Sequence, residues 1–214
     1  MKPELRRILT AVAALLVTGM AIFSIWRAQT APRGLNQALH RGLGERLAEE
    51  VAAEVGTSAE LVVVTLERGT SDVLDVQVEA FHRHLQRWPG LRVVRTDTID
   101  GDKGDKYGPG TGLSARRWQR LVEKEPGAQA IVSFLGTPDP EDLPAKTSTV
   151  GRPRLIAVSR SPKELAALIE RGLLARALVP RFSFPAPGPE TPRTPAEWFD
   201  NRFQVVSAAS VAAK

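Results

Sequence analysis

The most apolar stretch of the chain runs from Ile8 to Trp26, contains no charged residue, and is bounded by Arg6, Arg7 and Arg27. A helix of this length, at about 1.5 Å rise per residue, covers most of a hydrocarbon core roughly 30 Å thick. The stretch exceeds the apolar run of about 7–15 residues found in a signal peptide, and no clean A-x-A cleavage site follows it. We therefore predict an uncleaved transmembrane signal-anchor.

A short basic tail, residues 1–7, precedes this predicted anchor, and residues 27–34 form a linker after it. The compact basic cluster favours a cytoplasmic tail, although basic residues beyond the anchor nearly balance it. We predict a single-pass protein of a bacterial envelope, with the lipid bilayer as its partner through Ile8–Trp26. Its domain would lie outside the cytoplasm, in the periplasm.

From residue 35 the chain alternates short apolar runs with stretches of helical periodicity. The apolar runs are continuous and rich in β-branched residues, as in strands buried on both faces; they span 61–66, 91–96, 130–135, 154–159, 174–179 and, more weakly, 203–207. Periodicity and capping signals predict helices over 35–55, 72–88, 114–125 and 161–172, and a short one from 194. This alternation predicts one α/β domain over 35–208, a three-layer, doubly wound, mostly parallel sheet, followed by a frayed tail over 209–214.

The five stronger strands, at this spacing, suit a flavodoxin-like or Rossmann-like sheet. In outline the domain resembles one lobe of a type I periplasmic binding protein. The resemblance concerns the fold alone, because no family motif accompanies it and the pattern accounts for no second lobe. Gly42 and Gly44 interrupt the first helix of the domain, and each is expected to weaken it by up to ~1 kcal/mol relative to alanine.

Composition restricts the chemistry that this chain can perform. It has no cysteine, which excludes a disulfide framework, a thiolate nucleophile and a cysteine metal site. The net charge is +5, but aromatic residues make up only 6%, and we expect no nucleic-acid partner.

His82 and His84 lie two residues apart and cannot form a helical zinc pair, so we interpret them as solvated. The glycine-rich stretch 97–112 matches neither a phosphate-binding loop nor an EF-hand, and we predict no metal or cofactor.

Candidate ligand-binding residues follow the predicted strands, because ligands of open parallel sheets bind beyond the carboxyl ends of the strands. The loops at these ends offer hydroxyl, carboxylate and backbone groups suited to a polar ligand. The predicted ligand-binding residues are Thr70, Ser71, Asp72, Asp105, Thr111, Gly136, Thr137 and Ser159. The same residue types also cap helices and form turns, so a purely structural role is the alternative.

No nucleophile with its base, metal cluster or phosphate loop is evident in the sequence. We therefore predict a non-catalytic envelope domain that binds a small polar ligand or a protein partner. One alternative is an envelope hydrolase or transferase that uses Asp72, Asp105 or Asp139 as acid or base. A second alternative is a structural subunit of a membrane complex, in which the 35–55 helix or the proline-rich 181–193 segment docks on a membrane protein.

Overall fold

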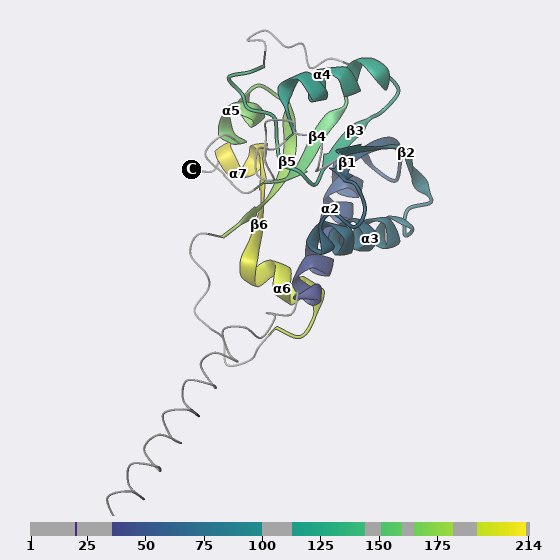
Figure 1. Cartoon of the computed structure of the whole chain (residues 1–214). Helices are drawn as coiled ribbons and strands as arrows, with labels where there is room; N and C mark the ends of the chain where they lie inside the picture. Colours follow the sequence, from purple (N-terminus) through teal and green to yellow (C-terminus); the bar gives the residue numbers. More distant parts are fainter. Residues whose placement is uncertain are drawn as a thin grey trace, which may run out of the picture. The chain divides into compact units, whose positions relative to one another are not determined.

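A computed structural model gives the architecture of the chain (Figure 1). It describes Met20 and residues 36–99, 113–143, 151–159, 165–181 and 192–212. The predicted anchor and its flanking tail and linker fall outside these residues, except for Met20. Within the described part of the chain, no helix is both long and apolar enough to cross a membrane. The anchor therefore stays a prediction, and the following description concerns the compact unit that begins at Asn36.

Six strands form one sheet in the order β2-β1-β3-β4-β5-β6. The first five are mutually parallel, and β6 runs antiparallel to β5. The strands are β1 (Ser58–Leu66), β2 (Gly90–Ile99), β3 (Ala130–Ser133), β4 (Arg154–Val158), β5 (Leu174–Pro180) and β6 (Phe203–Ser207). The predicted α/β, mostly parallel sheet is confirmed, and the order of the five parallel strands is the flavodoxin-like one.

Helices cover both faces of this sheet (Figure 1). One face carries the α2 layer, made of α2 (Gln37–Val55), α3 (Asp72–Leu85) and α6 (Pro195–Arg202). The other carries the α4 layer, made of α4 (Ala115–Lys124) and α5 (Leu165–Glu170). In β1, Leu61 and Val63 belong to the core under the α2 layer, whereas Val62 and Val64 belong to the core under the α4 layer. Burial on both faces explains the uninterrupted apolar run.

The structure describes residues 209–212 of the C-terminal tail, for which fraying stays a prediction. A short helix, α7 (Ala208–Ala212), follows β6. The Ser210 hydroxyl stabilises the first turn of α7. It accepts a hydrogen bond from the Ser207 amide at 2.8 Å and donates one to the Ser207 carbonyl oxygen at 2.8 Å. This local capping was not read from the alanine-rich sequence.

The two glycines of α2 allow other helices to approach closely. A Cβ atom on Gly42 would lie 2.0 Å from the Pro195 carbonyl oxygen of α6. A Cβ atom on Gly44 would lie 2.1 Å from the Gln77 carbonyl oxygen of α3. The expectation that these glycines merely weaken the helix therefore misses their role in packing.

The apolar stripe of α2 is buried against its own domain. Leu43, Leu47 and Val51 are at most 1% exposed and contribute to the core beneath α2 and α3. This burial counts against the hypothesis that the helix docks on a separate membrane subunit, since its apolar face is already covered.

Candidate functional site

The carboxyl ends of β1 and β3 lie side by side, because Val64 of β1 pairs with Ser133 of β3. The sheet continues from β1 to β2 on one side and from β3 to β4 on the other. Such a reversal of strand order is a topological switch point, where open α/β sheets bind their ligands. The Phe134 amide donates a hydrogen bond to the Val64 carbonyl oxygen at 3.0 Å. This bond holds the first residue after β3 against β1.

The exit loop of β1 holds three of the predicted ligand-binding residues. Ser71 caps α3, and its hydroxyl accepts a hydrogen bond from the Leu74 amide at 3.4 Å. Thr70 and Asp72 are exposed, and neither side chain has a polar partner within the described part of the chain. Ser71 therefore has the structural role that was the alternative, whereas Thr70 and Asp72 are free for a ligand.

The exit loop of β3 places two more predicted residues at the switch point. Gly136 adopts a φ of 97°, a left-handed conformation that favours glycine and turns the chain. Thr137 is half-buried beside it. Asp139 follows, and its Oδ1 accepts a hydrogen bond from the Glu141 amide at 2.9 Å, so this carboxylate stabilises a turn.

Of the three remaining predicted residues, Ser159 is buried, whereas Asp105 and Thr111 lie outside the described residues. Ser159 lies just beyond β4, is 6% exposed, and donates its amide to the Leu178 carbonyl at 2.9 Å. It lies at the exit of the strand next to β3, but below the surface. Asp105 and Thr111 fall outside the described residues, so their place relative to the switch point stays a prediction.

Two further hydroxyls at the strand ends were missed by sequence reasoning. Thr65 near the end of β1 is 6% exposed, and Ser133 at the end of β3 is fully buried. The Ser133 hydroxyl accepts a hydrogen bond from the Leu135 amide at 3.3 Å and so stabilises the turn out of the strand. A polar residue at the end of an otherwise apolar run, as in LVVVTL and AIVSFL, is the signal that could have identified them.

Charges around the switch point favour a neutral ligand over an anion. The first turn of α3 contains Asp72 and Asp75, which oppose an anion at that helix N-terminus. On α4, the Arg117 guanidinium donates hydrogen bonds to the Asp97 carboxylate at 2.5 Å and to the Thr98 carbonyl oxygen at 2.8 Å. Because this guanidinium is already engaged, it is a poor receptor for a phosphate.

His82 and His84 are less exposed than the prediction of solvated histidines implied, and His40 is half-buried as well. His40 and His82 are half-buried, and burial lowers the pKa of each from 6.5. His40 Nδ1 lies 3.2 Å from Gln77 Nε2, between α2 and α3. The His84 side chain is only 11% exposed, and its Nε2 lies 3.3 Å from a Glu49 carboxylate oxygen. Among the described residues, no group of three or more acidic or histidine side chains could hold a metal ion.

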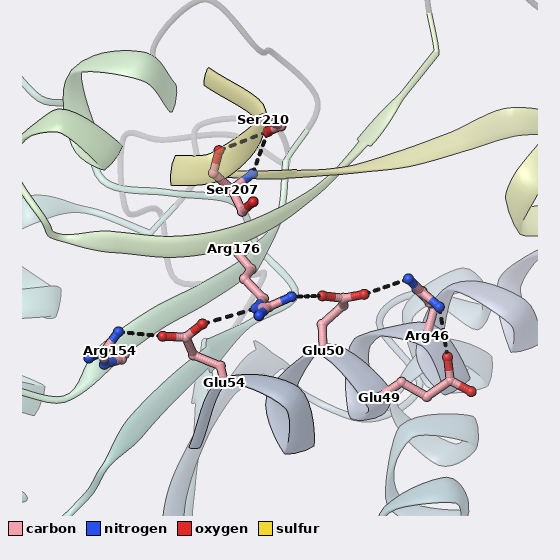
Figure 2. Close-up of polar contacts among 8 residues, drawn as sticks. All are labelled: Arg46, Glu49, Glu50, Glu54, Arg154, Arg176, Ser207 and Ser210. Carbon is pink, nitrogen blue, oxygen red and sulfur yellow. Dashed lines mark hydrogen bonds and ion pairs between the residues drawn. The ribbon is translucent and has the colours of Figure 1, made fainter. Parts of the chain in front are cut away.

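The most extensive charged cluster lies away from the switch point, between α2 and the sheet (Figure 2). The buried carboxylate of Glu50 contacts Arg46 at 2.7 Å and Arg176 at 2.6 Å. Glu54 contacts Arg176 at 3.0 Å and also pairs with Arg154. Burial alone would lower the pKa of Arg176, but the hydrogen bonds that its guanidinium donates to Glu54 and Glu50 outweigh this effect and raise that pKa. Both carboxylates are saturated by arginines, which indicates a structural cluster.

A shallow hollow of about 460 Å³ lies near the end of α3 and the start of β2. Its lining residues are His82, Leu85, Gln86, Trp88, Pro89, Leu91 and Val93. None of the predicted ligand-binding residues lines this hollow, which is at the opposite end of β2 from the strand exits.

No protein-family model and no curated protein matches this chain. Similar folds occur among solved structures. A solute-binding protein of an ABC transporter from Agrobacterium vitis, bound with alpha-D-tagatopyranose, has a TM-score of 0.54 and 16% identity over 82% of this chain and 58% of that one. A solute-binding protein from Burkholderia graminis, in complex with D-arabinose, has a TM-score of 0.53 and 14% identity over 82% and 62%.

A sugar-binding protein of an ABC transporter from Bacillus halodurans is also similar, with a TM-score of 0.51 and 17% identity over 65% of this chain and 45% of that chain. The chain thus spans about half of the length of the proteins it resembles. At these identities the likeness shows the fold: an α/β, mostly parallel sheet like that in periplasmic sugar-binding proteins. The resemblance predicted from the strand and helix pattern is confirmed at this level.

Proposed function

We propose that this domain binds a small, neutral, polar ligand of the monosaccharide class beside the switch point and performs no catalysis. The observation that carries the proposal is the adjacency of the β1 and β3 exits. It brings the free side chains of Thr70 and Asp72 to the same edge of the sheet as Gly136 and Thr137.

The chemistry of these groups suits a polyol. Hydroxyl groups both donate and accept hydrogen bonds, and a carboxylate accepts them, which matches the alternating needs of sugar hydroxyls. The similar solute-binding proteins from Agrobacterium vitis and Burkholderia graminis were solved with tagatopyranose and arabinose. Those proteins are only 16% and 14% identical to this chain, so their ligands suggest a class of small polar molecule and not a particular sugar.

The proposal includes attachment to the membrane through Ile8–Trp26, with the domain on the extracytoplasmic side. Its support is the uncharged apolar stretch, the basic residues that precede it and the absence of a cleavage signal. Mass spectrometry of the protein from membranes should find the intact N-terminus. A mature N-terminus near Pro32 would contradict the anchor without affecting ligand binding.

Ligand binding is tested by saturation-transfer NMR of the full chain in lipid nanodiscs with a panel of pentoses and hexoses. Thr70→Ala and Thr137→Ala should each weaken binding by about 5-fold to 10-fold, the effect of one hydrogen bond. Ser58→Ala is the matched control, since it removes an exposed hydroxyl at the start of β1, at the other edge of the sheet.

The control variant should bind as the wild-type chain does. Equal transfer to all sugars in the wild type and in both threonine variants would show that the strand exits are not the binding surface. Hydrolysis of an added nitrophenyl glycoside or nitrophenyl phosphate, lost with Asp72→Asn, would instead favour the hydrolase hypothesis.

A further inference from the structure

The solvent face of α4 presents three basic side chains in one line. Arg116, Arg120 and Lys124 are spaced four residues apart, and all three are exposed. Residues at this spacing lie above one another on a helix, at about 6 Å per step. We call these three residues the α4 ridge. Trp118, which is buried in the core, lies on roughly the opposite side of the helix.

The α4 ridge has no partner within the described part of its domain. None of its three side chains makes a hydrogen bond or ion pair with any part of the chain that the structure describes, whereas neighbouring arginines do. Arg117 pairs with Asp97, and Arg95 on β2 pairs with Glu125 at the end of α4. Basic side chains four residues apart repel each other, and Arg116 also lies at the positive end of the helix dipole. Folding alone therefore gives no reason for the ridge.

The α2 layer on the other face has the opposite charge balance. In the sequences of α2, α3 and α6, acidic residues outnumber basic ones, whereas basic residues outnumber acidic ones in α4. The domain is consequently bipolar across its sheet. A negatively charged planar surface would attract the α4 layer and repel the α2 layer.

We propose that the α4 ridge rests on anionic lipid headgroups of the membrane that holds the chain, which orients the domain with its α4 layer toward the bilayer. This inference rests on the proposed anchor. Guanidinium and ammonium groups bind phosphate through charge-assisted hydrogen bonds. The chain between Trp26 and Asn36 spans at most about 35 Å even when fully extended, so the anchor would keep the start of the domain within that distance of the bilayer. Each basic side chain close to an anionic surface strengthens the contact roughly fivefold.

The test uses the full chain in nanodiscs of phosphatidylcholine, with and without phosphatidylglycerol. The chain has no cysteine, so a single introduced cysteine carries a fluorescent donor at one position. Gln119→Cys places the donor on α4 beside the ridge, and Gln86→Cys places it at the end of α3. Energy transfer to acceptor-labelled lipids reports which layer is closer to the bilayer.

We expect higher transfer from position 119 than from position 86 in discs that contain phosphatidylglycerol, and a smaller difference in pure phosphatidylcholine. The variant R116Q/R120Q/K124Q should abolish the difference, as should about 1 M salt, which shortens the screening length to roughly 3 Å. The matched control R83Q/R87Q/R92Q removes the same number of exposed positive charges from α3 and its surroundings. It should retain the difference.

Each failure has a distinct meaning. A chain that does not co-purify with discs would overturn the anchor, and the ridge proposal with it. A chain that inserts but gives equal transfer from both positions would overturn the ridge proposal alone and leave an acidic protein surface as the occupant to test. Loss of the difference in the control variant as well would show that net charge, not the ridge, orients the domain.

Discussion

The helices on the two faces of the sheet differ in what their charged side chains contact. In the α2 layer, Glu50 and Glu54 are saturated by arginines of the helix and of the sheet. In the α4 layer, Arg116 and Arg120 extend into solvent without a partner among the described residues. The carboxylates of Glu50 and Glu54 therefore contribute to the folded structure, whereas the guanidinium groups of Arg116 and Arg120 are available for another molecule.

The two layers also differ in how closely their helices pack. Gly42 and Gly44 bring α2 against the backbones of α6 and α3. By contrast, α4 packs on the sheet through large side chains such as Trp118, which is 1% exposed. The α2 layer should therefore tolerate little added volume at its two glycines.

The largest expected effect comes from Gly44→Ala. Its new Cβ would lie 2.1 Å from the Gln77 carbonyl oxygen, so α2 and α3 must separate, and we expect a loss of about 3 kcal/mol in the free energy of unfolding. Gly127→Ala is the control, because its Cβ would meet only Glu60 Oε2, at 3.5 Å. Urea unfolding followed by circular dichroism measures both. Equal stability of the two variants would contradict the close-packing account.

A second substitution tests the buried ion cluster. Glu50→Gln keeps the shape of the side chain but leaves Arg46 and Arg176 with less compensation, and we expect a loss of about 2 kcal/mol. The corresponding change in the exposed pair of Glu79 and Arg83 should alter stability by about 0.5 kcal/mol or less. If Glu50→Gln had no greater effect than Glu79→Gln in urea unfolding, the cluster would not stabilise the α2 layer.

A smaller effect is expected from acidification, and it should be confined to the α2 layer. Burial lowers the pKa of His40 and His82 in the folded domain below 6.5, so the unfolded chain binds more protons as the pH falls. Their contribution to stability is therefore complete above about pH 6.5 and decreases as the pH falls toward the folded pKa.

Hydrogen exchange at about pH 7.5 and about pH 5.5, corrected for intrinsic rates, locates this effect. Protection of α2 and α3 should fall more than protection of α4, and His82→Gln should reduce the difference. An equal loss of protection on both faces would argue against histidine as the cause.

The smallest effect is expected from neutralising the α4 ridge. Because the three side chains repel each other and have no partner in the described domain, R116Q/R120Q/K124Q should leave the free energy of unfolding unchanged or raise it by about 0.5 kcal/mol. Chemical unfolding at low salt measures this change. A loss greater than about 1 kcal/mol would mean that the ridge stabilises the fold and is not reserved for a partner.

The strands could be predicted because a strand buried on both faces appears in the sequence as an uninterrupted run of apolar residues. The run 61–66 has no polar face, and the structure places its alternate residues in the two cores. The roles of Gly42 and Gly44 could not be predicted, since each depends on a backbone oxygen brought near only by the tertiary fold. The histidines were misread for the same reason, because the spacing of His82 and His84 says nothing about the helix packed beside them.

The candidate site was predictable in its location but only partly in its residues. Parallel strands predict that ligands bind beyond their carboxyl ends, but the strand order that brings the exits of β1 and β3 together came only from the structure. Ser71 could not be separated from a helix cap by sequence, since the same hydroxyl serves both purposes. Ser133 was overlooked because it ends a strand, and only the folded chain shows its bond to the turn.

The ion pair between Glu50 and Arg176 joins residues that are 126 positions apart in the chain. At a synthesis rate of about 5–20 residues per second, the partner of Glu50 emerges about 6–25 s after it. Helix α2 thus leaves the ribosome well before β5 and α6 and completes its contacts among the last. During that interval the part of its apolar face that contacts β5 and α6 has no cover, so we expect α2 to reach its final packing only when the end of the chain has been made.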